Sequence, residues 1–322
     1  MGKDQKLEGI VREIQTDLAA IEQNRSLCED SSFVERAEAL DVLEFHVIAR
    51  IERALQTTDR LTELTALKQR AGRLVQRLEE TDERLFQRVR DGIRSGHYTG
   101  IDLKHQLSTY AEHAPGAASQ DVGYDALDTF VNWLLAIGVA PAETMDREPE
   151  MVPYQPTPAR VLLELVETVE LGRHDVFYDL GSGLGQVPIL VNLLTGATTK
   201  GVEFEPAYCH YAQQCAKRLN LSQVEFINLD AREADYADGS VFFLYTPFEG
   251  QLLQAVLDRL RNESRKRRIK VCAYGPCVPQ VSRQEWLVRS EAGTGPGSGL
   301  ALFQSRAGDQ ARVDWNAQHD AS

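Results

Sequence analysis

Cysteine and histidine are scarce in this sequence, and neither forms a pattern typical of metal or redox sites. The 322 residues include five cysteines, an odd number, and none of them forms a Cys-x-x-Cys pair. The seven histidines do not cluster at the spacing of metal ligands. A disulfide framework is excluded, and nothing indicates a zinc site. We therefore expect reduced thiols, a cytoplasmic location and no bound metal.

Long apolar runs and an excess of positive charge are also missing. No run approaches the roughly 20 apolar residues that cross a bilayer, so we expect no membrane partner. Lys and Arg total 35 against 48 Asp and Glu, a net charge of −13, which disfavours bulk nucleic acid as a partner. The exception is residues 261–270, with six basic residues and one acid. This stretch is either a patch for an anionic substrate or the solvated end of a helix.

The first third of the chain has strong helical periodicity. Apolar residues recur at steps of three and four over residues 7–21, 40–55 and 64–89. Long helices with such stripes need partners, so we expect residues 1–120 to form a helical hairpin or bundle. Its stripes either serve substrate recognition or a homodimer, or simply bury one another in a cap, and the pattern leaves both open.

Residues 121–172 are predicted to be a helical lead-in. A helix beginning near Leu127 is expected to close at Gly138, and an acidic irregular stretch follows over residues 143–150. Next come Tyr154-Gln155-Pro156-Thr157-Pro158, where Thr157 is well placed to cap a helix that Pro158 starts. The same loop could instead fold over a ligand, and one residue can do both.

From residue 173 to 306, strands and helices alternate, which predicts an α/β domain with a mainly parallel sheet. The expected strands lie near 176–180, 199–204, 223–229, 240–245 and 269–274. The expected helices lie near 184–195, 206–219 and 250–262, and the crossover between the third and fourth strands is too short for a full helix. Two apolar runs at 286–290 and 300–305 predict a final hairpin, and 307–322 read as a polar tail.

The most informative stretch joins the first of these strands to its helix through a glycine turn. It reads Phe177-Tyr178-Asp179-Leu180-Gly181-Ser182-Gly183-Leu184-Gly185-Gln186. Glycines are needed where the chain turns tightly and approaches a ligand closely. A dinucleotide fingerprint would read G-x-G-x-x-G, whereas this turn reads G-x-G-x-G after a carboxylate. That carboxylate would repel a pyrophosphate and suits a ligand with an amino group.

This arrangement resembles motif I of the class I S-adenosylmethionine (SAM) methyltransferases, D-x-G-x-G-x-G. The resemblance implies a Rossmann-like seven-strand methyltransferase sheet with an antiparallel last strand, preceded here by an all-α N-terminal domain. It also implies SAM as cofactor. Ligands of such sheets bind at the carboxyl ends of the strands, beside the switch in strand order. We therefore expect a SAM site made of the glycine turn, including Ser182 and Gln186, and of the loop carrying Thr157, with Asp179 at the methionine end.

The next two strand ends fit the same cofactor. Glu203 ends the second strand, 18 positions after Gly185, and can accept hydrogen bonds from both ribose hydroxyls. Phe204 follows it and could lie against adenine. Asp230 and Ala231 end the third strand, where a carboxylate would accept from the adenine amino group and a backbone N–H would face a ring nitrogen. Asp230 also fits the simpler role of capping a loop.

The fourth strand ends where the methyl group would be transferred. Exocyclic-amine and glutamine-amide methyltransferases carry N/D-P-P-Y/F here, whereas this chain has Tyr245-Thr246-Pro247-Phe248. The first polar residue and the first proline are missing, which argues against adenine and glutamine-amide acceptors. Tyr154 and Tyr245 are the candidates for orienting or shielding the acceptor, and no general base can be chosen.

Within class I, the segment from Asp179 to Val187 is most similar to motif I of histone-lysine methyltransferases of the disruptor-of-telomeric-silencing type. That type also carries helices before its SAM domain and has an N-N-F-A-F segment where this chain has Tyr245 to Phe248. The resemblance implies an enzyme that methylates a protein side chain, with lysine as one option, or a small molecule. Two alternatives are a SAM-binding scaffold without turnover and, less well supported, a dinucleotide-dependent oxidoreductase or a nucleic-acid methyltransferase.

Overall fold

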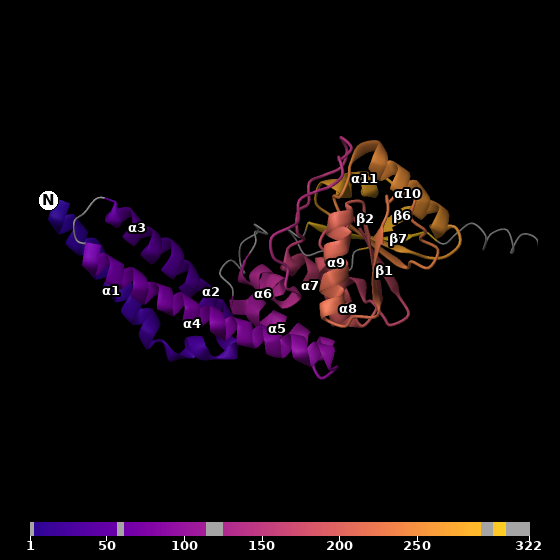
Figure 1. The fold of residues 1–322 in the computed structure, drawn as a ribbon. Helices are drawn as coiled ribbons and strands as arrows, with labels where there is room; N and C mark the ends of the chain where they lie inside the picture. The colour runs from indigo at the N-terminus through magenta and orange to yellow at the C-terminus, as the bar shows by residue number, and fades with distance from the viewer. Residues whose placement is uncertain (1–2, 57–60, 114–124, 291–298, 307–322) are drawn as a thin grey trace, which may run out of the picture. The chain divides into compact units, whose positions relative to one another are not determined.

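The computed structural model describes residues 3–56, 61–113, 125–290 and 299–306, which fall into two compact units (Figure 1). One unit takes its described residues from 1–92 and 109–117, and the other from 93–108 and 118–322. None of the helices within these described ranges is long and apolar enough to cross a membrane.

The described residues of the first unit form helices joined by short turns, as the periodicity predicts. Its helical segments are α1 (Lys3–Gln23), η1 (Arg25–Cys28), η2 (Asp30–Ser32), α2 (Phe33–Asp41), the π-helical η3 (Val42–Ile48), α3 (Ala49–Leu55) and α4 (Leu61–Arg94). Their apolar stripes meet in one core that includes the fully buried Ile14, Leu18, Leu43, Val47 and Leu64. The stripes therefore bury one another, which accounts for the pattern without a further partner.

A buried ion pair fixes the break between α1 and α2 against α4. Arg36 is 0% exposed and donates from Nε to Asp82 at 2.6 Å. It also donates to the carbonyls of Leu27 and Glu29, in the loop that the sequence marks only as a break in the pattern. Burial raises the pKa of the Asp82 carboxyl, and Arg36 opposes that rise.

The helices that lead into the sheet are α5 (Gly100–His113), α6 (Ala126–Leu135) and α7 (Ala159–Val169). Two predicted helix ends here are wrong. Helix α6 closes at Ala136, which takes the left-handed conformation with φ 52°, rather than at Gly138. Thr157 does not cap α7, because the first N–H of that helix, from Ala159, donates instead to Asp128 Oδ1 at 2.7 Å.

The second unit contains a seven-stranded sheet in the order β3-β2-β1-β4-β5-β7-β6. Its strands are β1 (Val176–Leu180), β2 (Thr198–Glu203), β3 (Val224–Asn228), β4 (Val241–Tyr245), β5 (Lys270–Tyr274), β6 (Leu287–Arg289) and β7 (Leu300–Ser305). Strands β1 to β5 are parallel, and β7 is antiparallel to β5 and β6. The predicted fold class and the final hairpin are confirmed. The strand order reverses between β1 and β4, which is where such sheets bind ligands.

The crossover elements are α8 (Gln186–Thr195), α9 (Pro206–Arg218), α10 (Gly250–Ser264), η4 (Gly275–Cys277) and α11 (Val278–Ser282). Residues 230–239 form turns without a helix, as the short gap predicts. Successive side chains of a strand point to opposite faces. Tyr178 and Phe242 therefore pack on the face covered by α10, while Phe177 and Phe243 stack on the opposite face.

The basic segment at the end of α10 is tied into the fold. Arg267 donates to the carbonyls of Gly239 and Tyr236 and forms an ion pair with Glu263. Lys266 also pairs with Glu263, at 2.9 Å. These contacts favour the helix-end interpretation of residues 261–270 over an anionic-substrate patch.

Candidate cofactor and acceptor site

The glycine turn after β1 needs its glycines for two physical reasons. Gly181, Gly183 and Gly185 all have left-handed φ angles, of 84°, 52° and 83°. A Cβ on Gly181 would lie 2.2 Å from Pro247 Cβ, and one on Gly183 would lie 2.3 Å from the Tyr154 ring. The turn therefore packs closely against the end of β4 on one side and against the loop before α7 on the other, and only glycine fits there.

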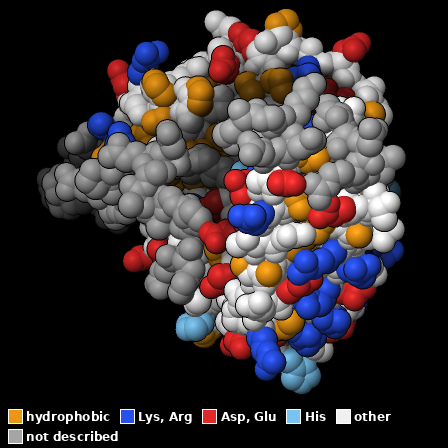
Figure 2. Space-filling model, turned by 90° about the vertical axis from the view of Figure 1, so that its left-hand side faces the viewer, with side chains coloured by type: hydrophobic (Ala, Val, Ile, Leu, Met, Phe, Trp, Pro, Cys, Tyr) orange, Lys and Arg blue, Asp and Glu red, His pale blue; other side chains and the backbone are white. Residues whose placement is uncertain are grey.

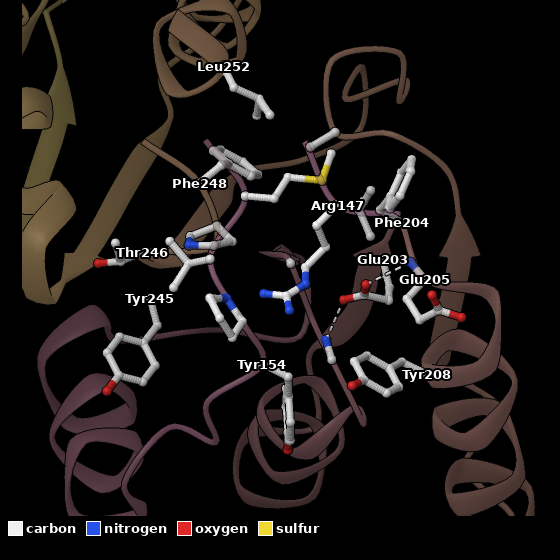
Figure 3. A pocket seen from close by; sticks show the side chains of 18 of the residues that line it. Arg147, Tyr154, Glu203, Phe204, Glu205, Tyr208, Tyr245, Thr246, Phe248 and Leu252 are labelled. Atoms are coloured by element: carbon white, nitrogen blue, oxygen red, sulfur yellow. Dashed lines mark hydrogen bonds between the residues drawn. The ribbon is translucent and has the colours of Figure 1, made fainter. Parts of the chain in front are cut away.

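A cavity of about 210 Å³ lies over the carboxyl ends of β1, β2, β3 and β4 (Figure 3). The residues predicted to bind cofactor or acceptor that line it are Tyr154, Gly181, Gly183, Glu203, Phe204, Asp230, Ala231 and Tyr245. Residues predicted from separate stretches of the sequence therefore come together at one opening. Gly185 does not reach it, because a Cβ there would meet Phe226 and Ala212 instead.

Backbone N–H groups hold the carboxylate of Glu203 in place. One oxygen accepts from the Gly183 N–H at 2.7 Å and the other from the Glu205 N–H at 2.9 Å, as the dashed lines in Figure 3 show. Burial raises the pKa of Glu203, although these N–H bonds act against the rise. Each oxygen has a second lone pair, so the carboxylate can still accept from a pair of hydroxyls.

A smaller cavity of about 30 Å³ lies beside the first, lined by Thr157, Asp179, Ser182 and Gln186 among others. Asp179 is 3% exposed, and burial together with the nearby charge of Glu203 raises its pKa well above the ordinary value. Within the described part of the chain, the buried Ser182 Oγ and Gln186 Oε1 have no hydrogen-bond partner. Oxygen acceptors dominate this corner, so its chemistry fits the donating ammonium group of a methionine end.

Asp230 caps its own loop, the simpler of the two roles that the sequence allowed, and it also binds the side chain of Arg232, which the sequence did not indicate. Its carboxylate accepts from three N–H groups of Arg232: the backbone N at 2.7 Å, a terminal nitrogen at 2.7 Å, and Nε, whose one hydrogen is shared between the two oxygens at 3.0 and 3.1 Å. Burial raises the pKa of Asp230, and the Arg232 hydrogen bonds outweigh burial and lower it. The other side of the same guanidinium pairs with Glu148.

The irregular acidic stretch contributes to the site, which sequence reasoning missed. Glu205 accepts from the N–H groups of Thr144 and Met145, both at 2.9 Å, and from the Thr144 hydroxyl at 2.6 Å. Burial acts in the other direction, but these bonds lower the pKa of Glu205 to about 2. Arg147 points into the larger cavity in Figure 3. The signal available in the sequence was Glu205 before Pro206, a helix-start pattern.

The end of β4 is held in an unusual backbone conformation. Thr246 is buried, and its φ of 41° is costly for a β-branched residue. Its hydroxyl donates to the Tyr274 carbonyl at 3.1 Å and accepts from the Cys277 N–H at 3.2 Å. The rings of Tyr245 and Tyr274 lie 4.8 Å apart. These contacts fix the backbone just before Phe248, which lines the larger cavity together with Leu252. Phe248 belongs to the segment that the sequence singled out, whereas Leu252 does not.

The strand order, the antiparallel β7 and the glycine turn define a class I methyltransferase fold. The family model described as "Histone methylation protein DOT1" matches residues 152–254, which confirms the resemblance drawn from motif I. This part of the chain is a class I SAM-dependent methyltransferase domain, and SAM is its cofactor.

Other comparisons are weaker. No curated protein matches the sequence. An RNA methyltransferase from Salinibacter ruber is 26% identical, covers 48% of this chain and 95% of its own, and has a TM-score of 0.35. A SAM-dependent methyltransferase from Thiobacillus denitrificans is 20% identical, covering 36% of this chain and 48% of its own, with a TM-score of 0.30. A precorrin-6y C5,15-methyltransferase from Geobacter metallireducens is 15% identical, covering 48% and 91%, with a TM-score of 0.37. TM-scores this low carry no argument about the reaction.

Proposed function

We propose that this chain transfers the methyl group of SAM to a nitrogen of a protein side chain, with lysine as the first candidate. The observation that carries this proposal is the single cavity that runs from the Glu203 carboxylate to the apolar residues Met151, Phe248 and Leu252. A cofactor held at one end would present its methyl group toward these apolar side chains, in a cavity that Arg147 and Glu249 also line. Such a cavity suits an aliphatic chain that enters with its amine deprotonated.

The cofactor roles proposed for individual residues follow from their chemistry. Asp179 and the oxygens of Ser182 and Gln186 would hold the ammonium end, with Thr157 on the facing loop. Glu203 would accept from the ribose hydroxyls, while Phe204 and Ala231 would contact adenine. The bound cofactor supplies an electrophilic methyl on a sulfonium, so the protein's task is alignment and exclusion of water. Tyr154 and Tyr245 would shield the acceptor nitrogen.

Charge supports a protein acceptor over a nucleic acid. The chain carries a net charge of −13. In the lower right of the face that Figure 2 draws, basic side chains gather with acidic side chains between them. Phosphate backbones are bound through several unopposed cations, so this mixture favours a polypeptide or a small molecule. The free cysteines, four of them buried, fit the cytoplasmic location that we propose.

The proposal is tested by incubating the full chain with methyl-labelled SAM and cell fractions, followed by protease or nuclease digestion. We expect label in protease-sensitive material and its loss with Glu203→Ala. Label in nuclease-sensitive material would contradict the proposed acceptor class. Label in small molecules would support methyl transfer by this chain but would show that the acceptor is a small molecule.

A scaffold that binds SAM without turnover is the second candidate. It is favoured by one observation: at the end of β4, Tyr245 stands where related motifs have Asn or Asp, and Thr246 stands where they have the first proline. In the scaffold alternative the N-terminal domain would carry the function, and SAM would bind without forming S-adenosylhomocysteine.

We propose the following division of the chain: a helical N-terminal domain at 1–120, a lead-in at 121–172, the methyltransferase domain at 173–306 and a tail at 307–322.

A further inference from the structure

The clearest feature without an assigned role is a chain of charges from the end of β3 to the segment 143–151. Arg232 is the central link. Its guanidinium contacts the Asp230 carboxylate, and the same group donates to Glu148, with one N–O distance of 3.2 Å. Glu148 is not among the residues that line the larger cavity, whereas Asp230 is. A residue outside the site is therefore joined to one predicted to bind adenine.

The segment that Arg232 reaches forms part of the cavity wall. Glu143, Arg147 and Met151 line the cavity from this segment. Its first half is held by Glu205 through the N–H groups of Thr144 and Met145. Its last residues are held at α10, where Glu150 accepts from the Leu252 N–H at 2.7 Å. Arg232 supplies the attachment between these two ends.

The Asp230 carboxylate has little acceptor capacity left for adenine. A carboxylate offers about four lone-pair positions, and three N–H groups of Arg232 point at them, with the Nε hydrogen shared between both oxygens. An adenine amino group would have to displace part of a bidentate, charge-assisted pair, which is among the stronger hydrogen-bond arrangements in proteins. A direct contact with adenine therefore competes with an existing one.

We propose that Asp230 serves the cofactor through Arg232, which acts as a positioning residue and holds segment 143–151 over the cavity by way of Glu148. The inference rests on the proposed SAM site and changes the role of one of its residues. Asp230 and Glu148 then belong to one unit, so removing either should have the same consequence. Recognition of the adenine amino group falls to other groups at the site.

The test compares Glu148→Gln, Arg232→Met, Asp230→Asn and the Glu148→Gln/Arg232→Met double variant in the full chain. Titrations would use S-adenosylhomocysteine and its deaminated analogue, S-inosylhomocysteine. Glu52→Gln is the matched control, since it removes one carboxylate that pairs with Lys68 in the helical unit. Hydrogen exchange at the Thr144, Met145 and Met151 amides reports on the segment without any ligand.

We expect each single variant to weaken S-adenosylhomocysteine binding about three- to tenfold, a modest effect because Arg232 and Glu148 are partly exposed to screening solvent. The double variant should bind no more weakly than the singles, since both remove one connection. Exchange at the segment's amides should accelerate, and Glu52→Gln should change nothing. The preference for the amino-bearing ligand over its deaminated analogue should survive Asp230→Asn.

Loss of that preference in Asp230→Asn, with Glu148→Gln behaving as wild type, would overturn the proposal and restore a direct adenine contact. Unchanged amide exchange in Glu148→Gln would also overturn it. A wild-type chain that binds no SAM would refute the proposed site and this role for Asp230 together. Amide hydrogen exchange would then still show whether Arg232 holds segment 143–151 in place.

Discussion

Asp179 and Glu203 lie at the carboxyl ends of neighbouring parallel strands, and the charge of Glu203 adds to burial in raising the pKa of Asp179. Two carboxylates placed so near each other in a buried setting destabilise the chain when both are ionised. A cationic ligand between them would relieve that repulsion. The pair thus links the stability of the protein to the occupancy of its site.

This link predicts the behaviour of Asp179→Asn. In the folded chain the pKa of Asp179 is raised above its ordinary value of 3.8. At a pH between 3.8 and this raised pKa, the folded chain therefore keeps a proton that the unfolded chain has lost. Stability from this group is therefore present at low pH and falls as pH rises toward the raised pKa. Asn cannot ionise, so the variant should be more stable at neutral pH and should lose SAM affinity.

Urea unfolding between about pH 5 and pH 8 checks the first part and calorimetry the second. Asp41→Asn, at an exposed position, is the control. A variant that is less stable than wild type at neutral pH, or that binds SAM normally, would contradict the assignment.

Glu203 should contribute directly to cofactor affinity. Glu203→Ala removes charged acceptors from the ribose hydroxyls and should weaken SAM binding by about 1–3 kcal/mol. It also leaves the Gly183 N–H without its acceptor, so Glu203→Gln, which keeps an oxygen, should lose less. Isothermal calorimetry measures both. Affinity unchanged in both Glu203→Ala and Asp230→Ala would show that the site is elsewhere.

The glycine turn offers a test with an internal control. Gly183→Ala should abolish SAM binding, because its Cβ would lie 2.3 Å from the Tyr154 ring and because φ is 52° there. The left-handed conformation alone costs about 1–3 kcal/mol for a residue other than glycine. Gly72→Ala lies inside α4 with no atom within 4 Å of the added carbon, and it should stabilise the chain by about 0.5–1 kcal/mol. Calorimetry measures SAM binding, and thermal unfolding measures the stability of both variants. Equal changes in the stability of Gly183→Ala and Gly72→Ala would contradict this account.

In the helical unit, the Arg36–Asp82 pair predicts an asymmetric response to mutation. Arg36→Met leaves the Asp82 carboxyl buried without its partner and should cost about 3–5 kcal/mol. Replacing both residues, by Arg36→Met and Asp82→Leu, should recover most of that loss. Urea unfolding followed by circular dichroism measures the free energies. A double variant as unstable as Arg36→Met would show that the loop carbonyls, and not the carboxylate, are what Arg36 serves.

Self-association through the helical unit remains a prediction from the amphipathic stripes. The internal core uses the same stripes, so we expect the exposed Phe45, 64% accessible on η3, to matter more for association than any core position. Light scattering of the full chain and of Phe45→Ser gives the masses. A monomeric full chain would exclude the homodimer and support the alternative in which the helices only bury one another.

The strands of the sheet were predictable because each is a short apolar run between turn residues, and the final hairpin was predictable for the same reason. The helix ends were not. Thr157 has the right residue type for a cap. The N–H of Ala159, however, donates to Asp128, which lies 31 positions away along the chain. Local propensity cannot register a competing acceptor from another helix.

The sequence by itself determined the fold class, the glycine turn and the residues at the strand ends, because period, residue size and spacing act locally and parallel strands must end at one edge. Tertiary structure alone decided which side chains those residues meet. It paired Arg232 with Glu148, placed Glu205 on the backbone of segment 143–151 and left the oxygens of Ser182 and Gln186 without partners among the described residues. Hydrogen bonds between distant segments depend on how the chain packs, and no pattern in the sequence records that packing.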